Sequence, residues 1–331
     1  MDIARRGLTI TTIAVAALLL AGCAEAAEPA ASSSPTSTPV PSVTPEPETG
    51  PRSLFDDDCA RLLSETDAAT IVGAPVQLAE RWYETGDVAI RQLGGIQCVW
   101  SDPAATVGAA LSLVVLPSRV GGEPVEDYCD PDFGCSFTAS ASDFDLYGLV
   151  RGAVAGEPLL PRAAAATEAF TLAVAAQAVP EPYLVDAAWP VPIDCAALDT
   201  AGIVGTLIGD PAAVGFSTGG DAEPNAGFYA ALRAAGAVTC GWSGESDGIN
   251  AQILPGGAWI EDEIAATSGA QPATVPGVDS AVVIDDALHV FDGDNWIVLL
   301  GTADELPLSA ETLGTAAAAL VADLDALPQS S

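Results

Sequence analysis

The chain has 331 residues and a formal net charge of −35, with 45 acidic residues against 10 basic ones. All ten basic residues are arginine, because the sequence contains no lysine. Nucleic acids and anionic lipid headgroups are bound through Lys and Arg, so this balance argues against both classes of partner. It permits a cation or a basic protein as a partner.

The first predicted element is a signal peptide over residues 1–22. Two arginines, Arg5 and Arg6, form a basic n-region, and residues 10–20 form an apolar run that is too short to span a bilayer. The peptide ends in Leu-Ala-Gly before Cys23, which resembles the lipobox of bacterial lipoproteins. The resemblance implies cleavage before Cys23, a diacylglycerol on its thiol and an acyl chain on its new amine.

Such an anchor is sufficient to hold a protein at a membrane, because several acyl chains attach stably where one attaches only reversibly. The predicted location is therefore the cell membrane, with the chain lipid-anchored and facing the extracytoplasmic side. Two alternatives stay open at this point. Residues 24–27 would allow an ordinary secretory cleavage, and paired arginines are also found in twin-arginine export signals.

Residues 23–53 are predicted to be a disordered tether. They are rich in Ala, Ser, Thr and Pro and show no apolar periodicity, so they cannot bury enough apolar surface to offset the entropy of ordering. The remaining chain is long enough for two domains of ordinary size. Proline-containing segments near the boundary predict a first domain over residues 54–180, a linker over residues 181–192 and a second domain over residues 193–328.

The two domains are predicted to be copies of one unit. Residues 58–62 match residues 194–198, and a Cys-x-Trp-Ser motif at residues 98–101 recurs at residues 240–243. A Gly-x-Pro motif follows the first cysteine of each copy at the same spacing, and a Leu-Pro pair follows each second cysteine. This many matches in one order indicate a tandem duplication.

Six cysteines remain beside Cys23, and they allow fifteen pairings. Equivalent repeats should hold equivalent bonds, and the space outside a membrane permits disulfides. The predicted pairs are Cys59–Cys98, Cys195–Cys240 and, as a short loop staple, Cys129–Cys135. Zinc sites pair cysteines at a closer spacing than is found here, so we expect no metal and no cofactor. Trp100 and Trp242 are expected in the cores, beside the disulfides.

Each repeat is predicted to contain the same elements in the same order. Short helices carry the first cysteine, two strands follow, and a connection then leads to a hairpin and a terminal helix. In the second repeat the connection is helical over residues 259–267, and an Asp-Gly turn joins the hairpin strands over residues 288–300. The terminal helices are predicted over residues 162–179 and 310–327. Helices around consecutive strands predict an α+β fold, with an antiparallel sheet packed by helices in each repeat.

Five features occur together in this chain: the lipobox, the tether, the cysteine-bearing helix, the Cys-x-Trp strand and a Val-Pro-Gly-Val-Asp-Ser-Ala segment at residues 275–281. In this combination the chain resembles a family of actinobacterial cell-envelope lipoproteins of unknown function. That family is related to PsbP-like envelope and sensor domains. The resemblance covers both repeats and is clearer in the second, because the first lacks this segment and adds the loop of Cys129 and Cys135. It implies an α/β sandwich without known catalysis and assigns a role to no residue.

No coherent catalytic set is visible. The chain has one histidine, His289, which lies in an apolar run predicted to be a strand, where a structural role is expected. Ser243 follows Gly241 as in a nucleophile elbow, but Glu245 replaces the second glycine of that motif. Because a nucleophile of this kind needs a base, the sequence predicts a protein that is not an enzyme.

Carboxylates are plentiful, but their local patterns have structural explanations. Residues 56–58 are three aspartates that would place negative charge at a helix N-terminus. Asp292, Asp294 and Asn295 offer oxygen ligands that calcium prefers, but the rest of a calcium loop is missing, so a hairpin turn is expected. The acidic loop over residues 126–135 is the best candidate recognition surface, because it combines charge, two aromatic side chains and a covalent staple.

These features predict a non-catalytic, membrane-anchored cell-envelope lipoprotein that acts as a binding module. Its partners would be the membrane, through Cys23, and an envelope protein or a small ligand held between the domains, with no nucleic acid. One alternative is a solute-binding lipoprotein that serves a transporter. A less favoured one is a secreted hydrolase that uses two carboxylates facing one deep pocket.

Overall fold

The structure is a computed structural model. It describes residues 50–328, apart from residues 81–82, 105–107, 121–126, 131–133, 153–157, 184, 186–188, 190, 218–225, 245–246 and 304–307. The predicted signal peptide, Cys23 and the tether up to residue 49 lie outside the described residues. Within the described ranges, no helix is both long enough and apolar enough to cross a membrane.

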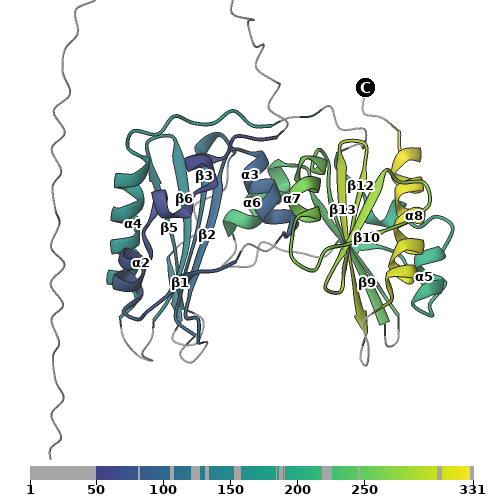
Figure 1. Ribbon diagram of the computed structural model, residues 1–331, viewed down its shortest axis with the longest axis horizontal. Coiled ribbons are helices and arrows are strands. Elements are labelled where there is room, and N and C mark those ends of the chain that lie inside the picture. Colours follow the sequence, from purple (N-terminus) through teal and green to yellow (C-terminus); the bar gives the residue numbers. More distant parts are fainter. Residues whose placement is uncertain are drawn as a thin grey trace, which may run out of the picture. The chain divides into compact units, whose positions relative to one another are not determined.

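The first repeat forms one antiparallel sheet with the strand order β1-β2-β3-β6-β5-β4 (Figure 1). Its strands are β1 Gln77–Leu78, β2 Ile96–Ser101, β3 Ala110–Pro117, β4 Tyr128–Asp130, β5 Gly134–Ala141 and β6 Phe144–Arg151. Its helices are η1 Leu54–Asp57, α1 Cys59–Leu62, α2 Glu65–Val72, α3 Thr85–Gln92, η2 Ser118–Val120 and α4 Leu160–Val174.

The second repeat forms a separate antiparallel sheet with the order β10-β11-β12-β13-β9-β8-β7. Its strands are β7 Phe216–Ser217, β8 Val238–Ser243, β9 Asp247–Leu254, β10 Gln271–Ala273, β11 Ser280–Ile284, β12 Ala287–Asp292 and β13 Asn295–Ala303. Its helices are η3 Cys195–Ala197, α5 Ile203–Leu207, α6 Ala226–Ala234, η4 Ala258–Ile260, α7 Glu261–Ala265 and α8 Ala310–Ala326.

The two sheets share one topology. Without β10, the strands β7-β8-β9-β13-β12-β11 take the places of β1-β2-β3-β6-β5-β4. This arrangement confirms the predicted α+β fold class, with an antiparallel sheet packed by helices in each half, and it fits a tandem repeat. Every strand of each sheet comes from one repeat, so the chain passes from the first sheet to the second once.

The outer face of each sheet carries a core of the predicted kind. Helices α1, α2 and α4 cover the first sheet, and α5 and α8 cover the second (Figure 1). Trp100 and Trp242 are buried in these two cores, each within the same core as the disulfide of its repeat. Helix α2 has the cap that its sequence indicates, because the Ser64 side chain accepts a hydrogen bond from the Asp67 N–H.

The first terminal helix is shorter than predicted. Helix α4 ends at Val174 rather than at Val179, and the Gln177 N–H donates to the Val174 carbonyl in a following turn, at 3.0 Å. Pro180 opposes a helix that runs up to it, because it has no N–H to donate to the residue 176 carbonyl and it restricts residue 179 to extended backbone. Helix α8 lies within one residue of its predicted range.

A third core lies between the sheets and was not anticipated from the sequence. Helices α3 and α6 pack against each other there, and each also contacts the sheet of the other repeat, α3 through β9 and α6 through β3 and β6. The contact depends on two glycines. A Cβ at Gly86 would lie 1.9 Å from the Phe228 ring, and one at Gly227 would lie 2.7 Å from Tyr147.

The shared core joins the repeats into one unit. Its buried residues come from both halves, among them Val88 and Leu116 of the first and Ile264 and Trp296 of the second. Hydrogen bonds cross the same boundary, because Thr85 donates to the side chain of Gln252 and Gln92 donates to the carbonyl of residue 255. Residues 47–331 accordingly form a single compact unit.

Candidate functional site

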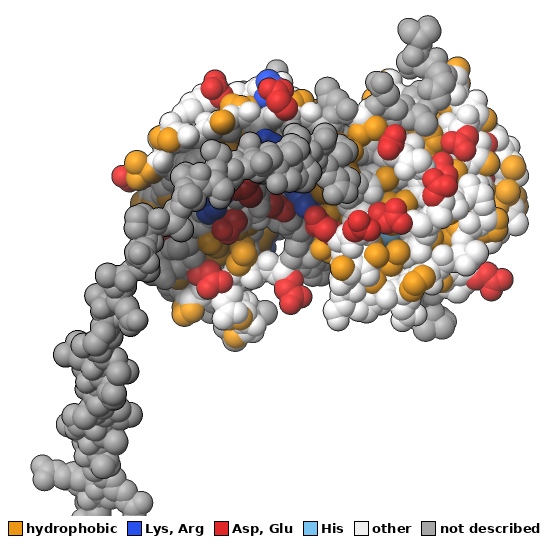
Figure 2. Space-filling model, turned by 45° about the horizontal axis from the view of Figure 1, so that its top comes forward, with side chains coloured by type: hydrophobic (Ala, Val, Ile, Leu, Met, Phe, Trp, Pro, Cys, Tyr) orange, Lys and Arg blue, Asp and Glu red, His pale blue; other side chains and the backbone are white. Residues whose placement is uncertain are grey.

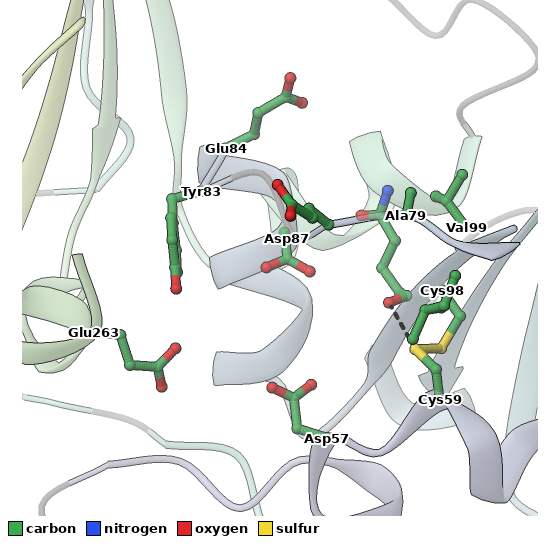
Figure 3. Close-up of a pocket in the computed structure, with 12 residues that line it drawn as sticks. Asp57, Cys59, Ala79, Tyr83, Glu84, Asp87, Cys98, Val99 and Glu263 are labelled. Carbon is green, nitrogen blue, oxygen red and sulfur yellow. Dashed lines mark hydrogen bonds between the residues drawn. A yellow bond between two sulfur atoms is a disulfide. The ribbon is translucent and has the colours of Figure 1, made fainter. Parts of the chain in front are cut away.

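A cavity of about 550 Å³ lies at the junction of the two repeats (Figure 3). We call it the inter-repeat cavity. Tyr83, Leu78 and Val99 form part of its wall, together with the Cys59–Cys98 disulfide. Its carboxylates come from both repeats. They are Asp57, Glu80, Glu84 and Asp87 of the first and Glu263 of the second.

Arg91 ties the two sides of this junction together. Its Nε lies 3.0 Å from Oδ2 of Asp57, and its terminal nitrogens donate to both oxygens of Glu263 at 2.7 and 3.1 Å. The guanidinium also lies over the Trp259 ring, 4.7 Å from its centroid. The Arg91 side chain is only 8% exposed, so both ion pairs are shielded from solvent on the arginine side.

Charge in the inter-repeat cavity is predominantly negative. Its described lining holds five carboxylates, and Arg91 contributes one positive charge that already contacts Asp57 and Glu263. Asp87 lies one turn before Arg91 on α3 and is buried, and Figure 3 shows it facing the same space as Asp57 and Glu263. The cavity therefore suits a positively charged group of modest size.

The wall that carries Asp57 has an unusual backbone. Phe55, Asp56 and Asp57 have φ angles of 60°, 54° and 66°, which place three consecutive non-glycine residues in the left-handed region. This conformation costs roughly 1–2 kcal/mol per residue in a left-handed helical turn. Side chains hold it in place, because Phe55 is buried and Arg61 binds both the Phe55 carbonyl at 3.0 Å and the Asp56 carboxylate at 2.5 Å.

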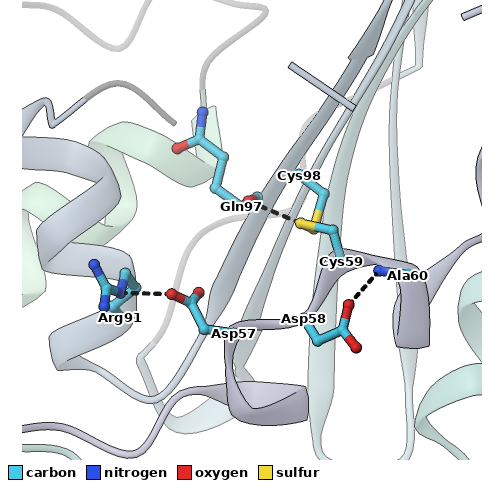
Figure 4. Close-up of a disulfide and its surroundings, with 7 residues drawn as sticks. All are labelled: Asp57, Asp58, Cys59, Ala60, Arg91, Gln97 and Cys98. Carbon is cyan, nitrogen blue, oxygen red and sulfur yellow. Dashed lines mark hydrogen bonds and ion pairs between the residues drawn. A yellow bond between two sulfur atoms is a disulfide. The ribbon is translucent and has the colours of Figure 1, made fainter. Parts of the chain in front are cut away.

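The three adjacent aspartates therefore have separate roles, and Figure 4 shows those of Asp57 and Asp58. Asp58 caps α1 as predicted, because its side chain accepts from the Ala60 N–H at 2.9 Å. Asp57 instead binds Arg91, and Asp56 binds Arg61. Only one of the three acts on the helix N-terminus, since the left-handed turn directs the other two elsewhere.

The three disulfides join the expected pairs. Cys59–Cys98 and Cys195–Cys240 have Cα separations of 5.7 and 5.4 Å, and they occupy equivalent positions in the two repeats. Cys129–Cys135 joins directly opposed residues of β4 and β5. The first of these bonds has a second role, because it lies in the wall of the inter-repeat cavity.

The lone histidine is far from any nucleophile motif. His289 lies on β12, is 4% exposed and stacks on Trp296 with ring centroids 5.8 Å apart. Burial lowers its pKa from 6.5 to about 4, so it is neutral at pH 7. Ser243 ends β8, which β9 and β13 separate from β12 in the sheet. The structure does not bring these two side chains together.

The suggested calcium ligands form a hairpin turn. The Asn295 side chain is buried, donates to the Asp292 carbonyl at 3.3 Å and accepts from the Gly256 N–H at 3.4 Å. Burial and then the neighbouring charges of Asp325 and Asp279 raise the pKa of Asp292. Among the described residues, no group of three or more His, Cys, Asp or Glu side chains is arranged to hold a metal ion.

The acidic loop over residues 126–135 is described only in part, because residues 126 and 131–133 lie outside the described ranges. Tyr128 on β4 is 56% exposed, and Asp127 accepts from the Thr138 N–H at 3.3 Å. Its role as a recognition surface stays a prediction. Figure 2 shows that acidic side chains are spread across one face of both repeats, whereas the arginines visible there are few.

Asp87, Arg91 and Glu263 did not stand out in the sequence. One signal was available, because Arg91 and Arg233 both stand seven residues before the second cysteine of their repeats. Nothing in the local sequence shows that Glu263 lies opposite Arg91, since 172 positions separate the two residues.

No family model matches this chain, and neither does any curated protein or solved structure.

Proposed function

We propose that this chain is a non-catalytic lipoprotein of the bacterial cell envelope that acts by binding. Cys23 anchors it on the extracytoplasmic side of the membrane, and residues 23–53 tether the folded repeats. The support for the anchor is the basic n-region, the short apolar run and the Leu-Ala-Gly-Cys motif. The three disulfides agree with an oxidising compartment.

The ligand is held in the inter-repeat cavity and carries a positive charge. The observation that carries this proposal is the cavity itself, which the first repeat and Glu263 of the second line, and whose described lining holds five carboxylates beside the single charge of Arg91. Its volume suits a small organic molecule. Tyr83 and Val99 supply aromatic and apolar wall for the body of an organic cation.

Two observations bear on the alternatives. Both oxygens of Glu263 accept from Arg91, so Glu263 is not placed to serve as the proton donor of a two-carboxylate hydrolase, which leaves that alternative Glu80, Glu84 and Asp87 of the described lining. The single passage of the chain between the sheets favours a fixed module over a transporter-linked binding protein, whose two lobes we expect to be joined by several crossovers.

Localisation is tested by fractionating cells that express the full chain or a Cys23→Ser variant. We expect the full chain in the membrane fraction and the variant in the soluble extracytoplasmic fraction. Equal distribution of the two proteins would contradict the lipid anchor.

Ligand class is tested by calorimetry on the mature Cys23→Ser chain, with spermidine as an organic cation and citrate as an anion. We expect spermidine to bind and citrate to give no heat. Glu84→Gln removes a carboxylate of the cavity, and Glu168→Gln removes an exposed carboxylate on α4 as the matched control. A loss of affinity in Glu168→Gln equal to that in Glu84→Gln would mean that spermidine responds to overall charge and not to the cavity.

A further inference from the structure

Residues 54–58, which we call the latch, are held in a conformation that their sequence does not favour. The three left-handed residues, Phe55 to Asp57, are not glycines. Such backbone persists only where surrounding contacts impose it, and it is concentrated at ligand clamps and switch regions. Here the imposing contacts are specific, because Arg61 holds the start of the turn and Arg91 holds its end.

The latch has a fixed end and room to move. Cys59, directly after it, is bonded to Cys98 on β2 of the first sheet, which fixes the C-terminal end. On its other side lies a second cavity of about 600 Å³, lined by residues 50–56 and 177–183. Asp57 faces the inter-repeat cavity, so the latch separates two hollow regions.

We propose that the latch is a two-state closing element of the inter-repeat cavity, held shut by the ion pair between Asp57 and Arg91. In the released state this pair is broken, residues 55–57 return to ordinary backbone, and the wall formed by Asp57 withdraws toward the second cavity. This proposal rests on the proposed binding function for the identity of its ligand, but the motion of the latch does not depend on it.

A cation in the inter-repeat cavity favours the closed state. Asp57 contributes its carboxylate to the cavity only while the turn is closed, so a positively charged ligand gains more from the closed state than from the released one. A ligand shifts an equilibrium by the difference between its affinities for the two states. Ligand binding and latch closure therefore support each other.

Hydrogen exchange on the mature Cys23→Ser chain tests the closing pair. The N–H groups of Asp56 and Asp58 are reporters, because they donate within the turn to the carbonyls of Ser53 and Phe55, both at 3.2 Å. We expect Asp57→Asn to speed their exchange about tenfold while amides of α4 and α8 keep their rates. Glu263→Gln is the matched control, since it removes the other partner of Arg91, and we expect at most about a twofold change at the latch.

A second variant should stabilise the closed turn, because it relieves the backbone strain instead of breaking the ion pair. Asp56→Gly leaves the Asp57–Arg91 pair and the Arg61 bond to the Phe55 carbonyl intact, and it places a residue that tolerates positive φ at the centre of the turn. The Asp56–Arg61 pair that it removes is exposed and contributes little to stability. We expect slower exchange at Asp58 than in the parent chain. Equal exchange in Asp57→Asn and the parent chain, or equal acceleration in Glu263→Gln, would overturn the latch.

Spermidine separates this inference from the proposed function. In the parent chain we expect spermidine to slow hydrogen exchange at residues 83–92 and at the latch. In Asp57→Asn we expect it to slow exchange at residues 83–92 alone. Protection of residues 83–92 without protection of the latch would overturn the coupling. If spermidine protects neither segment, the proposed ligand class fails, whereas the Asp57→Asn and Asp56→Gly results still decide whether the latch exists.

Discussion

The two repeats have one scaffold but differ where the inter-repeat cavity lies. Aligned on their cysteines, Arg91 of the first repeat corresponds to Arg233 of the second. Arg91 is buried among carboxylates and Trp259, whereas Arg233 is exposed on α6. The position of Asp57 is occupied by Ile193 in the second repeat, where it is buried in the outer core.

A second residue difference between the repeats lies at the inter-repeat cavity. Asp87 of α3, which lines the cavity, corresponds to Tyr229 of α6. The duplication therefore repeats the strands and the main disulfide but not the acidic lining. A sheet and its outer core are needed for folding in each half, whereas the acidic lining is not part of that shared scaffold.

The largest expected effect is the loss of stability on removing a main disulfide, and it should be the same in the two repeats. Replacing Cys59 and Cys98 by Ala, or Cys195 and Cys240 by Ala, should each lower the free energy of unfolding by about 4 kcal/mol, since each bond closes a loop of similar length. Chemical denaturation measures both losses. Only the first pair should also weaken spermidine binding, because only that bond lines the cavity. Equal effects on binding would remove the asymmetry between the repeats.

The next effect separates the two matched arginines. Arg91→Met should destabilise the protein by about 2–3 kcal/mol, because it removes the ion pairs of Arg91 with Asp57 and Glu263 at a buried position. Arg233→Met should cost less than about 0.5 kcal/mol, because the side chain is exposed. Denaturant unfolding of both variants gives the comparison, and similar losses would show that Arg91 has no special role in joining the repeats.

A smaller effect concerns the shared core. Gly86→Ala should cost about 1–3 kcal/mol, because the new methyl group collides with the Phe228 ring and overpacks the α3–α6 contact. Phe228→Ala alone should also destabilise, but the double variant should recover part of the Gly86→Ala loss. Thermal unfolding of the four proteins forms a double-mutant cycle. Strictly additive losses would mean that the two residues do not interlock.

The last effect is absent at pH 7 and appears only as the pH falls, as a dependence of stability on the protonation of a residue in the second sheet. Burial lowers the folded pKa of His289 to about 4, below its unfolded value of 6.5, so the unfolded state binds the proton more readily. Stability from this residue is complete above pH 6.5 and is lost as the pH falls toward 4, by about 1.4 kcal/mol per pH unit. The free energy of unfolding is measured for the parent chain and for His289→Gln between pH 7 and 4, and the difference between the two curves gives this slope. Parallel curves would contradict it.

Local sequence predicted the outer cores because their signals are periodic and repeated. The hairpin over β12 and β13 follows from an Asp-Gly turn between apolar runs, and α8 agrees with the terminal helix predicted over residues 310–327. Helix α3 gave no such signal. It has only eight residues and contains Gly86, which lowers its helix propensity, and it buries its polar side chains together with its apolar ones, so its burial does not follow the pattern of its sequence.

The sequence by itself determined the tandem duplication, the cysteine pairs and the fold class, because each depends on motifs that recur at fixed spacing along one chain. Only the tertiary structure decided that α3 and α6 form a shared core and that Asp57, Arg91 and Glu263 meet beside a cavity. These residues belong to three separate elements, and their contacts arise from the packing of one sheet against the helices of the other. Packing of this kind leaves no local pattern, since each residue is placed by partners that lie far away in the chain.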